Sequence, residues 1–119
     1  MKDQKKTTEH AHSELVKILL DCAVACETCA AACLYEEDPA MMARCIETDR
    51  DCADICTLGA RLLLRDSENA SHFLTACIEA SRLCAEECKK HNNDHCRQCA
   101  EACDRCANAC IDQYAEAVK

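Results

Sequence analysis

Apolar and cysteine positions recur at intervals of three and four residues along the chain, which is the spacing of one face of an α-helix. Polar stretches divide this pattern into four segments, at about residues 8–36, 39–65, 67–91 and 94–117. Asp38-Pro39 predicts the start of the second segment, because Asp is a favoured N-cap and Pro is favoured at the first helical position. The connections are short, so consecutive helices must be antiparallel. The sequence therefore predicts an all-α fold, an antiparallel up-down-up-down four-helix bundle that forms one domain over residues 1–119.

The composition agrees with a helical protein and narrows its partners. One Gly and one Pro in 119 residues are too few for the turns of a β-barrel or β-sandwich, and we expect Gly59 in the second segment to allow close approach of a neighbouring helix. The net charge of −8 argues against a nucleic-acid partner, since phosphate binding needs a basic surface. No apolar run is long enough to cross a membrane. The first residues show no secretory signal, so we expect a cytoplasmic protein unless a signal peptide has been removed.

The cysteines form an internal repeat. The first and fourth segments each carry a complete C-x3-C-x2-C-x3-C quartet, whereas the second and third segments have Asp49 and Ser81 in place of one cysteine each. Cys96 is additional to the quartets. Spacings of four, three and four residues keep side chains on one stripe of a helix, so all of the thiols should face the bundle axis. The fifteen positions are Cys22, Cys26, Cys29, Cys33, Cys45, Cys52, Cys56, Cys77, Cys84, Cys88, Cys96, Cys99, Cys103, Cys106 and Cys110.

Three explanations of this stripe compete. Cysteine can serve as a small core hydrophobe, but an apolar bundle would use Leu and Ile at such positions. A high cysteine content favours disulfides, yet the count is odd, and i,i+4 partners have Cβ atoms about 5–6 Å apart, farther than the ~3.5–4.5 Å of a disulfide. Two thiolates on one metal ion sit about 4.5 Å apart, which suits i,i+4 pairs and facing helices. We therefore favour metal binding.

Charge and geometry favour Cu(I) among the thiolate-bound metals, which are Cu(I), Zn(II) and iron–sulfur clusters. The spacing differs from the C-x2-C-x2-C-x3-C run of bacterial ferredoxins, and a helical stripe lacks the loop knuckles of structural zinc sites. Fifteen buried thiolates would carry a charge of −15 in an apolar interior, and one Cu(I) per thiolate cancels it. The sequence thus favours a store of multiple Cu(I) ions, about one per thiolate. A zinc or soft-metal buffering and detoxification protein and a thiol-redox protein that cycles disulfides remain alternatives.

The thiols are not centred along the predicted bundle. They lie toward the end that holds the turns at 36–39 and 91–94, where Met41, Met42, His91 and His95 could catch a soft metal ion and pass it inward. At the other end we expect an apolar plug and histidines without a metal role. The expected plug residues are Leu15, Ile18, Leu19, Leu62, Leu63, Phe73, Leu74, Ile111, Tyr114 and Val118, and the histidines are His10, His12 and His72.

The cysteine pattern resembles that of the bacterial copper storage proteins over roughly residues 15–112. It is carried by C-AVA-C-ET-C-AAA-C in the first segment, by C-IETDRD-C-ADI-C at Cys45–Cys56, and by C-AEE-C-KKHNNDH-C-RQ-C-AEA-C-DR-C-ANA-C from Cys84 to Cys110. The resemblance implies Cu(I) bound mostly by CxxxC thiolates, a homotetramer of bundles, a place in the cytosolic branch of the family, and no catalytic reaction. It also implies that Asp49 is a polar partner of the thiolates, although an ion pair with a neighbouring Arg would explain this residue equally well. Ser81 departs from the family pattern.

Overall fold

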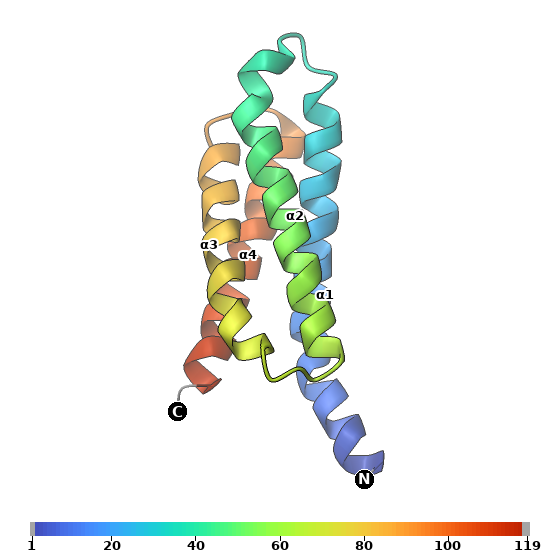
Figure 1. Cartoon of the computed structure of the whole chain (residues 1–119). Helices are drawn as coiled ribbons and strands as arrows, with labels where there is room; N and C mark the ends of the chain where they lie inside the picture. The colour runs from blue at the N-terminus through green and yellow to red at the C-terminus, as the bar shows by residue number, and fades with distance from the viewer. Residues whose placement is uncertain (1, 118–119) are drawn as a thin grey trace.

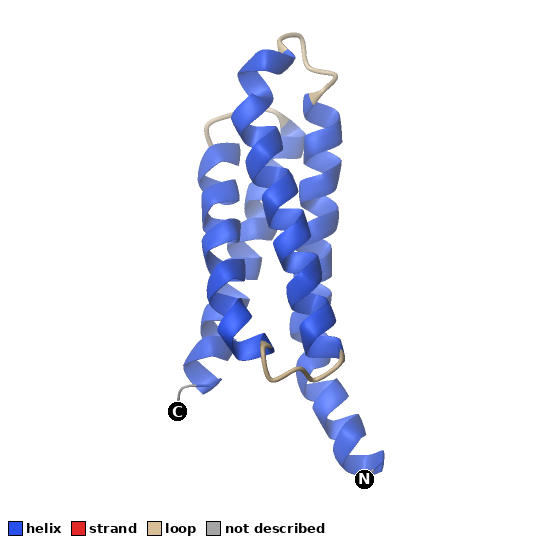
Figure 2. Cartoon of the chain, in the orientation of Figure 1, coloured by secondary structure: helices blue, strands red, loops and turns tan. Residues whose placement is uncertain are grey.

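The computed structural model describes the backbone of residues 2–117 and the side chains of residues 12–114. Long helices account for most of this region, and the described residues contain no β-strand (Figure 1, Figure 2). A short 3₁₀ helix, η1 (Pro39–Met42), leads directly into the second long helix. The long helices are α1 (Lys2–Cys33), α2 (Ala43–Leu64), α3 (Ala70–Cys88) and α4 (Asp94–Ala117).

Consecutive helices run antiparallel and form an up-down-up-down four-helix bundle (Figure 1). Each helix packs against two neighbours, so that α1 contacts α2 and α4, and α3 contacts the same two helices. The connections at 34–42 and 89–93 lie at one end, which we call the open end. The connection at 65–69 lies at the opposite end, beside the last turn of α4, and we call this the closed end. The fold class expected from the sequence is confirmed.

The helix ends at the open end differ from those expected. α1 ends at Cys33 rather than near residue 36, because residues 34–36 form hydrogen bonds to carbonyls three residues back, which tighten the last turn. A helix does begin at Pro39, but its first turn is 3₁₀, and the Asp38 side chain makes no capping hydrogen bond. α3 ends at Cys88 rather than near residue 91, and the chain then turns toward α4.

The connection between α2 and α3 is set by a hydrogen-bonded helix ending. Asp66 has a φ of 53°, a left-handed conformation that Asp tolerates better than most residues. The N–H groups of Asp66 and Ser67 bond to the carbonyls of Leu63 and Leu62 at 3.1 and 2.9 Å, which is a Schellman ending. Because this ending uses the residues up to 67, α3 begins at Ala70 rather than near residue 67.

Apolar side chains close the far end of the bundle less completely than expected. Ile111 and Tyr114 are 37% and 43% exposed, so the sequence-based assignment of these two residues to the plug is wrong. Ile111 follows the buried Cys110 by one residue, which turns its side chain about 100° away from the interior stripe, and Tyr114 lies in the last turn of α4. Val118 and the His10 side chain lie outside the described residues. The plug residues that are buried or partly buried are Leu15, Ile18, Leu19, Leu62, Leu63, Phe73 and Leu74.

Candidate metal centre

All fifteen cysteines are free thiols with no exposed surface. The four helices direct them toward the axis because the 4-3-4 spacing keeps them on one stripe of each helix. Small alanines flank the stripes, and Ala53, Ala60 and Ala85 are almost fully buried beside them. Such small neighbours let the helices approach closely. The interior is therefore lined with sulfur from the open end through the middle of the bundle.

Neighbouring sulfur atoms are in contact both across and along the helices. Cys26 Sγ lies 3.6 Å from Cys103 Sγ, and Cys45 Sγ lies 3.7 Å from Cys88 Sγ, each pair joining two helices. Within the CxxxC pair of α3, the Cys84 and Cys88 sulfurs are 4.0 Å apart. Contacts of this kind link one thiol to the next, so that an ion bound to one thiol always has another thiol within reach.

The sulfur spacing decides which coordination the core fits. For a metal–sulfur bond of about 2.3 Å, two thiolates lie about 4.6 Å apart in linear coordination, about 4.0 Å apart in trigonal coordination and about 3.8 Å apart in tetrahedral coordination. Contacting sulfurs across the helices are closer than the linear separation, as the 3.8 Å between Cys22 and Cys52 illustrates. These distances are those of the metal-free thiols, whereas the spacing near 4.5 Å expected from the sequence is that of two thiolates on one metal ion. The thiols either share ions among three ligands or move apart as they bind.

Several groups of four ligands are close enough to hold a metal ion. In each group the ligand atoms all lie within 4.8 Å of one another and every residue is buried. Two of the groups contain the Asp49 carboxylate. The groups include Cys22–Cys26–Cys52–Cys103, Cys26–Cys84–Cys99–Cys103, Cys29–Cys33–Cys45–Cys96, Cys29–Cys45–Asp49–Cys88 and Asp49–Cys84–Cys88–Cys99.

Asp49 is a fully buried carboxylate surrounded by thiols. Its Oδ1 accepts hydrogen bonds from Cys84 at 3.0 Å, Cys99 at 3.2 Å and Cys88 at 3.6 Å. Burial raises its pKa to about 7, although the hydrogen bond from Cys84 acts in the opposite direction. Among the described residues Asp49 forms no ion pair with an Arg, so that alternative is wrong. Asp49 is placed to take a proton from a thiol or to contribute an oxygen ligand.

Burial also affects the thiols. It raises the pKa of Cys33, and it raises the pKa of Cys96 to about 11. A thiol in an apolar interior resists ionisation, because the thiolate loses its hydration there. Cys33 and Cys96 therefore hold their protons more tightly than a solvated thiol does. A soft metal ion must displace a proton from each thiol that it binds.

His95, one of the predicted open-end ligands, contacts the sulfur core directly. Its Nδ1 lies 3.4 Å from Cys29 Sγ and 3.5 Å from Cys96 Sγ. Its Nε2 lies 2.6 Å from Glu36 Oε2. A proton on Nε2 donated to Glu36 leaves the Nδ1 lone pair facing the two thiols, which is the arrangement of histidine ligands in metal sites.

The other three predicted open-end ligands do not join His95 in one cluster. His91 is mostly buried, and its Nε2 lies 3.0 Å from Glu87 Oε2. Burial acts to raise the pKa of Glu87, but His91 and Lys90 outweigh it and hold this pKa below its usual value. Met42 is a core side chain with 5% exposure, whereas Met41 is 71% exposed at the surface.

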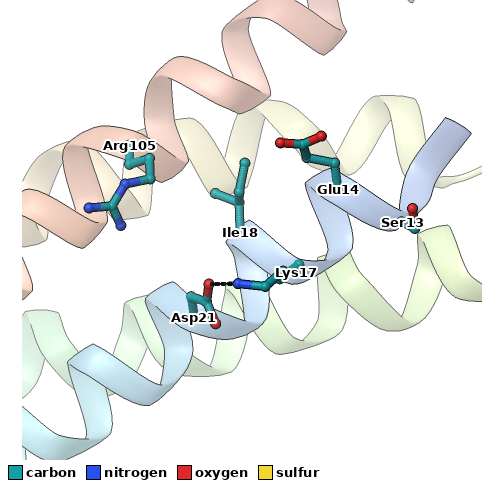
Figure 3. A pocket seen from close by; sticks show the side chains of 6 residues that line it. All are labelled: Ser13, Glu14, Lys17, Ile18, Asp21 and Arg105. Carbon is teal, nitrogen blue, oxygen red and sulfur yellow. Dashed lines mark hydrogen bonds and ion pairs between the residues drawn. The ribbon is translucent and has the colours of Figure 1, made fainter. Parts of the chain in front are cut away.

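Outside the core, a groove between α1 and α4 carries charged side chains of both signs (Figure 3). Lys17 and Asp21 form an ion pair of 2.9 Å on α1, and Arg105 approaches from α4. The residues that line the groove include no cysteine, methionine or histidine. The groove therefore offers no soft ligand and is not part of the sulfur core.

Comparison with known proteins identifies the family. The family model described as copper storage protein matches residues 8–115, which is most of the chain. The chain belongs to the copper storage protein family. No helix among the described residues combines the length and apolar character needed to cross a membrane.

Solved copper storage proteins share the fold of this chain. A cytosolic copper storage protein from Streptomyces lividans with five coppers is 39% identical, with a TM-score of 0.86 over 92% of this chain and 97% of the other. The Cu(I)-bound copper storage protein BsCsp3 is 36% identical, with a TM-score of 0.82 over 85% and 95% of the two chains. The cysteine-rich protein YhjQ of Bacillus subtilis (strain 168) is 38% identical over 95 residues, which is 80% of this chain and 88% of the relative.

Two residues of this copper storage protein's open end, Glu36 and Glu87, were not predicted from the sequence. Glu36, in the turn after α1, pairs with His95 of α4, and Glu87 pairs with His91, four residues farther along the chain. The i,i+4 spacing of Glu87 and His91 is a signal that could have indicated their contact. No local pattern connects Glu36 with His95, because their contact depends on how the turn after α1 folds over α4.

Proposed function

We propose that this protein is a cytosolic Cu(I) store that binds many ions inside the bundle and catalyses no reaction. The observation that carries the proposal is that fifteen fully buried thiols form linked contacts down the axis from the open end. A structural protein would have no need of fifteen buried thiols along the interior of four helices. The copper-loaded relatives, one of them described as cytosolic, support the same function.

Charge selects Cu(I) among the ions that this core could hold. Full ionisation of fifteen thiols would place a charge of −15 in a region that water does not reach. One Cu(I) for each displaced proton keeps the core neutral at every stage of loading, and Cu(I) prefers soft sulfur ligands. A capacity of about one Cu(I) per thiolate follows. The metal ligands are the fifteen cysteines named above.

Loading starts at the open end and proceeds inward. His95 Nδ1 binds an incoming ion together with Cys29 or Cys96, because these three atoms lie within hydrogen-bond distance of one another. Met41 at the surface and Met42 in the core assist as thioether ligands, and His91 supports this end through Glu87. The ion then passes from thiol to thiol through contacts of less than 4 Å.

The Asp49 carboxylate accepts the first proton that a thiol in the middle of the core gives up. It already accepts hydrogen bonds from Cys84 and Cys99, so it can take a proton from either thiol as Cu(I) binds the sulfur. With its pKa raised to about 7 by burial, the carboxyl is part protonated and part ionised at neutral pH. The Asp49–Cys84–Cys88–Cys99 group is therefore the first interior site to fill.

A zinc-buffering function is the second candidate, and one observation favours it. Contacting sulfurs such as Cys26 and Cys84, at 3.8 Å, have the separation of a tetrahedral zinc site. Each tetrathiolate zinc site would retain two negative charges in the interior, however, and the described core offers no buried cation to offset them. We therefore rank zinc below Cu(I).

An anaerobic titration tests the proposed function. Reduced, metal-free protein is titrated with Cu(I) in competition with a coloured Cu(I) chelator, and free thiols are counted before and after loading. We expect about one tightly bound Cu(I) per cysteine and full protection of the thiols. Binding of only a few Cu(I) ions, together with tight zinc that Cu(I) does not displace, would favour the zinc function. A low thiol count in freshly purified protein would favour disulfide cycling.

The resemblance to the family also leads us to propose that four bundles assemble into a homotetramer. Sedimentation velocity of the metal-free and loaded protein measures this directly. A single species of four chains supports the assembly, and a monomer in both states rejects it.

A further inference from the structure

We propose, on the basis of the Cu(I)-storage function, that Ser81 is a constriction in the sulfur core that separates four closed-end thiols from the rest. These four, which we call the deep thiols, are Cys56, Cys77, Cys106 and Cys110. They fill last and release their copper last. Ser81 is thus a residue that sets the rate of copper exchange in this particular chain.

Ser81 stands where the quartet of α3 would place a cysteine, and it is fully buried. Its Oγ lies 3.7 Å from Cys52 Sγ and 3.8 Å from Cys56 Sγ. A hydroxyl oxygen is a hard ligand that Cu(I) does not select over sulfur. At this level, therefore, α3 places a hydroxyl within hydrogen-bond distance of two sulfurs but offers no soft ligand for an ion.

Cys56 and Cys106 lie beside Ser81, and Cys77 and Cys110 lie beyond it toward the closed end. Cys56 Sγ lies 3.7 Å from Cys106 Sγ, and Cys77 interacts with both Cys110 and Cys56. Leu19 of α1 borders the space around Cys77, and the thiol of α1 that interacts with this group is Cys22, through Cys56 and Cys106. The four deep thiols themselves come from three helices, α2, α3 and α4.

The position of Cys77 depends on a missing side chain in α2. A Cβ atom on Gly59 would lie 2.8 Å from Cys77 Sγ, so the thiol occupies the space that glycine leaves open. Leu19 and Phe73 border the same space at 3.7 and 3.8 Å from that Cβ position. The chain thus makes room for a thiol at the closed end, where an ordinary apolar core would place a larger side chain. This indicates that the deep thiols are a built site.

Copper can reach the deep thiols only through thiols of α1, α2 and α4, because α3 has no thiol at position 81. Above Ser81, Cys84 of α3 contacts Cys26 and Cys99, so that ions can move along α3 as well as along its neighbours. At Ser81 this route along α3 stops, and transfer must use the Cys52–Cys56 pair, at 3.8 Å, or the thiols of α1 and α4. When the Ser81 hydroxyl donates its one proton to Cys52 or Cys56, that sulfur becomes a weaker ligand for an ion in transfer.

Copper release from fully loaded protein tests the inference. An excess of bathocuproine disulfonate is added anaerobically, and the coloured Cu(I) complex is followed with time. We expect two phases in the wild type, with the slow phase holding about a quarter of the copper, because four of the fifteen cysteines are deep thiols. Ser81→Cys should raise the capacity by about one ion and speed the slow phase at least ~3-fold, because it restores a ligand at the constriction.

Two further variants distinguish the effect of the missing ligand at position 81 from a general change in the packing of the bundle. Ser81→Ala removes the hydroxyl without adding a ligand, so the slow phase should remain, and its rate then measures the effect of the hydrogen bonds alone. The double variant Cys77→Ser/Cys110→Ser should lose most of the slow phase while the fast phase keeps its rate. Far-UV circular dichroism of each metal-free variant shows that its helices are retained.

Single-phase release from the wild type, or a slow phase that Ser81→Cys leaves unchanged, overturns the inference. Failure of the storage function looks different, because the wild type would then bind too little Cu(I) for any release curve to be recorded.

Discussion

A single methyl group at position 59 should expose how tightly the sulfur core is packed. In Gly59→Ala the new Cβ would lie 2.8 Å from Cys77 Sγ, whereas ordinary contacts of this kind lie at 3.4–4 Å. The thiol or the α2 backbone must therefore move by at least about 0.6 Å. Overpacking of a well-packed core costs about 1–3 kcal/mol, while the change from Gly to Ala inside a helix gains about 1 kcal/mol. We expect a net loss of about 0–2 kcal/mol in the free energy of unfolding.

A double-mutant cycle separates the two effects. In a Cys77→Ala background the clash is gone, and the remaining neighbours, Leu19 and Phe73, lie at ordinary contact distances from the added methyl. Gly59→Ala should then stabilise the protein by up to about 1 kcal/mol, which gives a coupling of about 1–3 kcal/mol between positions 59 and 77. The free energies come from urea unfolding of the metal-free, reduced proteins followed by circular dichroism. If Gly59→Ala stabilises the wild type as much as it stabilises the Cys77→Ala protein, the close packing of Gly59 and Cys77 is refuted.

Three further predictions concern the buried carboxylate, the open end and the ligand set. The pKa of Asp49 is raised from 3.8 to about 7 on folding, so its contribution to stability is present below about pH 4 and is lost as the pH rises through 7; urea unfolding should show the metal-free wild type losing roughly 2–3 kcal/mol more than Asp49→Asn between pH 5 and 8, and equal losses would contradict this. His95→Ala should slow Cu(I) uptake in stopped-flow measurements without lowering capacity, whereas His91→Ala, whose ring pairs with Glu87, should change the rate much less; equal rates for all three proteins would reject the role of His95. A variant with both complete quartets changed to Ser should lose most Cu(I) capacity but keep its helicity, since Ser costs only about 0.5 kcal/mol per site in helix propensity; near-wild-type copper content with retained helicity would refute the ligand assignment. The eight positions of that variant are Cys22, Cys26, Cys29, Cys33, Cys99, Cys103, Cys106 and Cys110.

The fold class and the burial of the cysteines could be predicted because both depend on periodicity. A 4-3-4 spacing places the cysteines on one side of a helix, and short connections force consecutive helices to be antiparallel neighbours. The same reasoning failed for Ile111, because a count of apolar residues near a helix end ignores which way each one points. It also placed the start of α3 too early, since the hydrogen bonds of Asp66 and Ser67 that end α2 depend on a left-handed residue that is not glycine.

The finer geometry of the site depends on contacts between distant residues. The hydrogen bond between Glu36 and His95 joins the turn after α1 to the first turn of α4, and no local pattern encodes it. The spacing expected from the sequence is that of two thiolates on one ion, whereas the contacts of the metal-free thiols, such as the 3.6 Å between Cys26 and Cys103, depend on how the helices pack. Asp49 could be identified as unusual from its place in the quartet, whereas its hydrogen bonds from three thiols became visible only with α3 and α4 in position.

The complete burial of the sulfur atoms has a consequence for how this protein deals with other molecules. A macromolecule that carries or receives copper cannot insert its own ligands among fifteen thiols that have no exposed surface. If ions enter and leave beside His95, as proposed above, it would exchange only the ions that have moved outward to that end of the bundle. A small thiol or chelator would need only a brief separation of the helix ends to reach a buried ion. The bundle would then act as a size filter, which discriminates among copper carriers by their bulk as well as by their affinity for the ion.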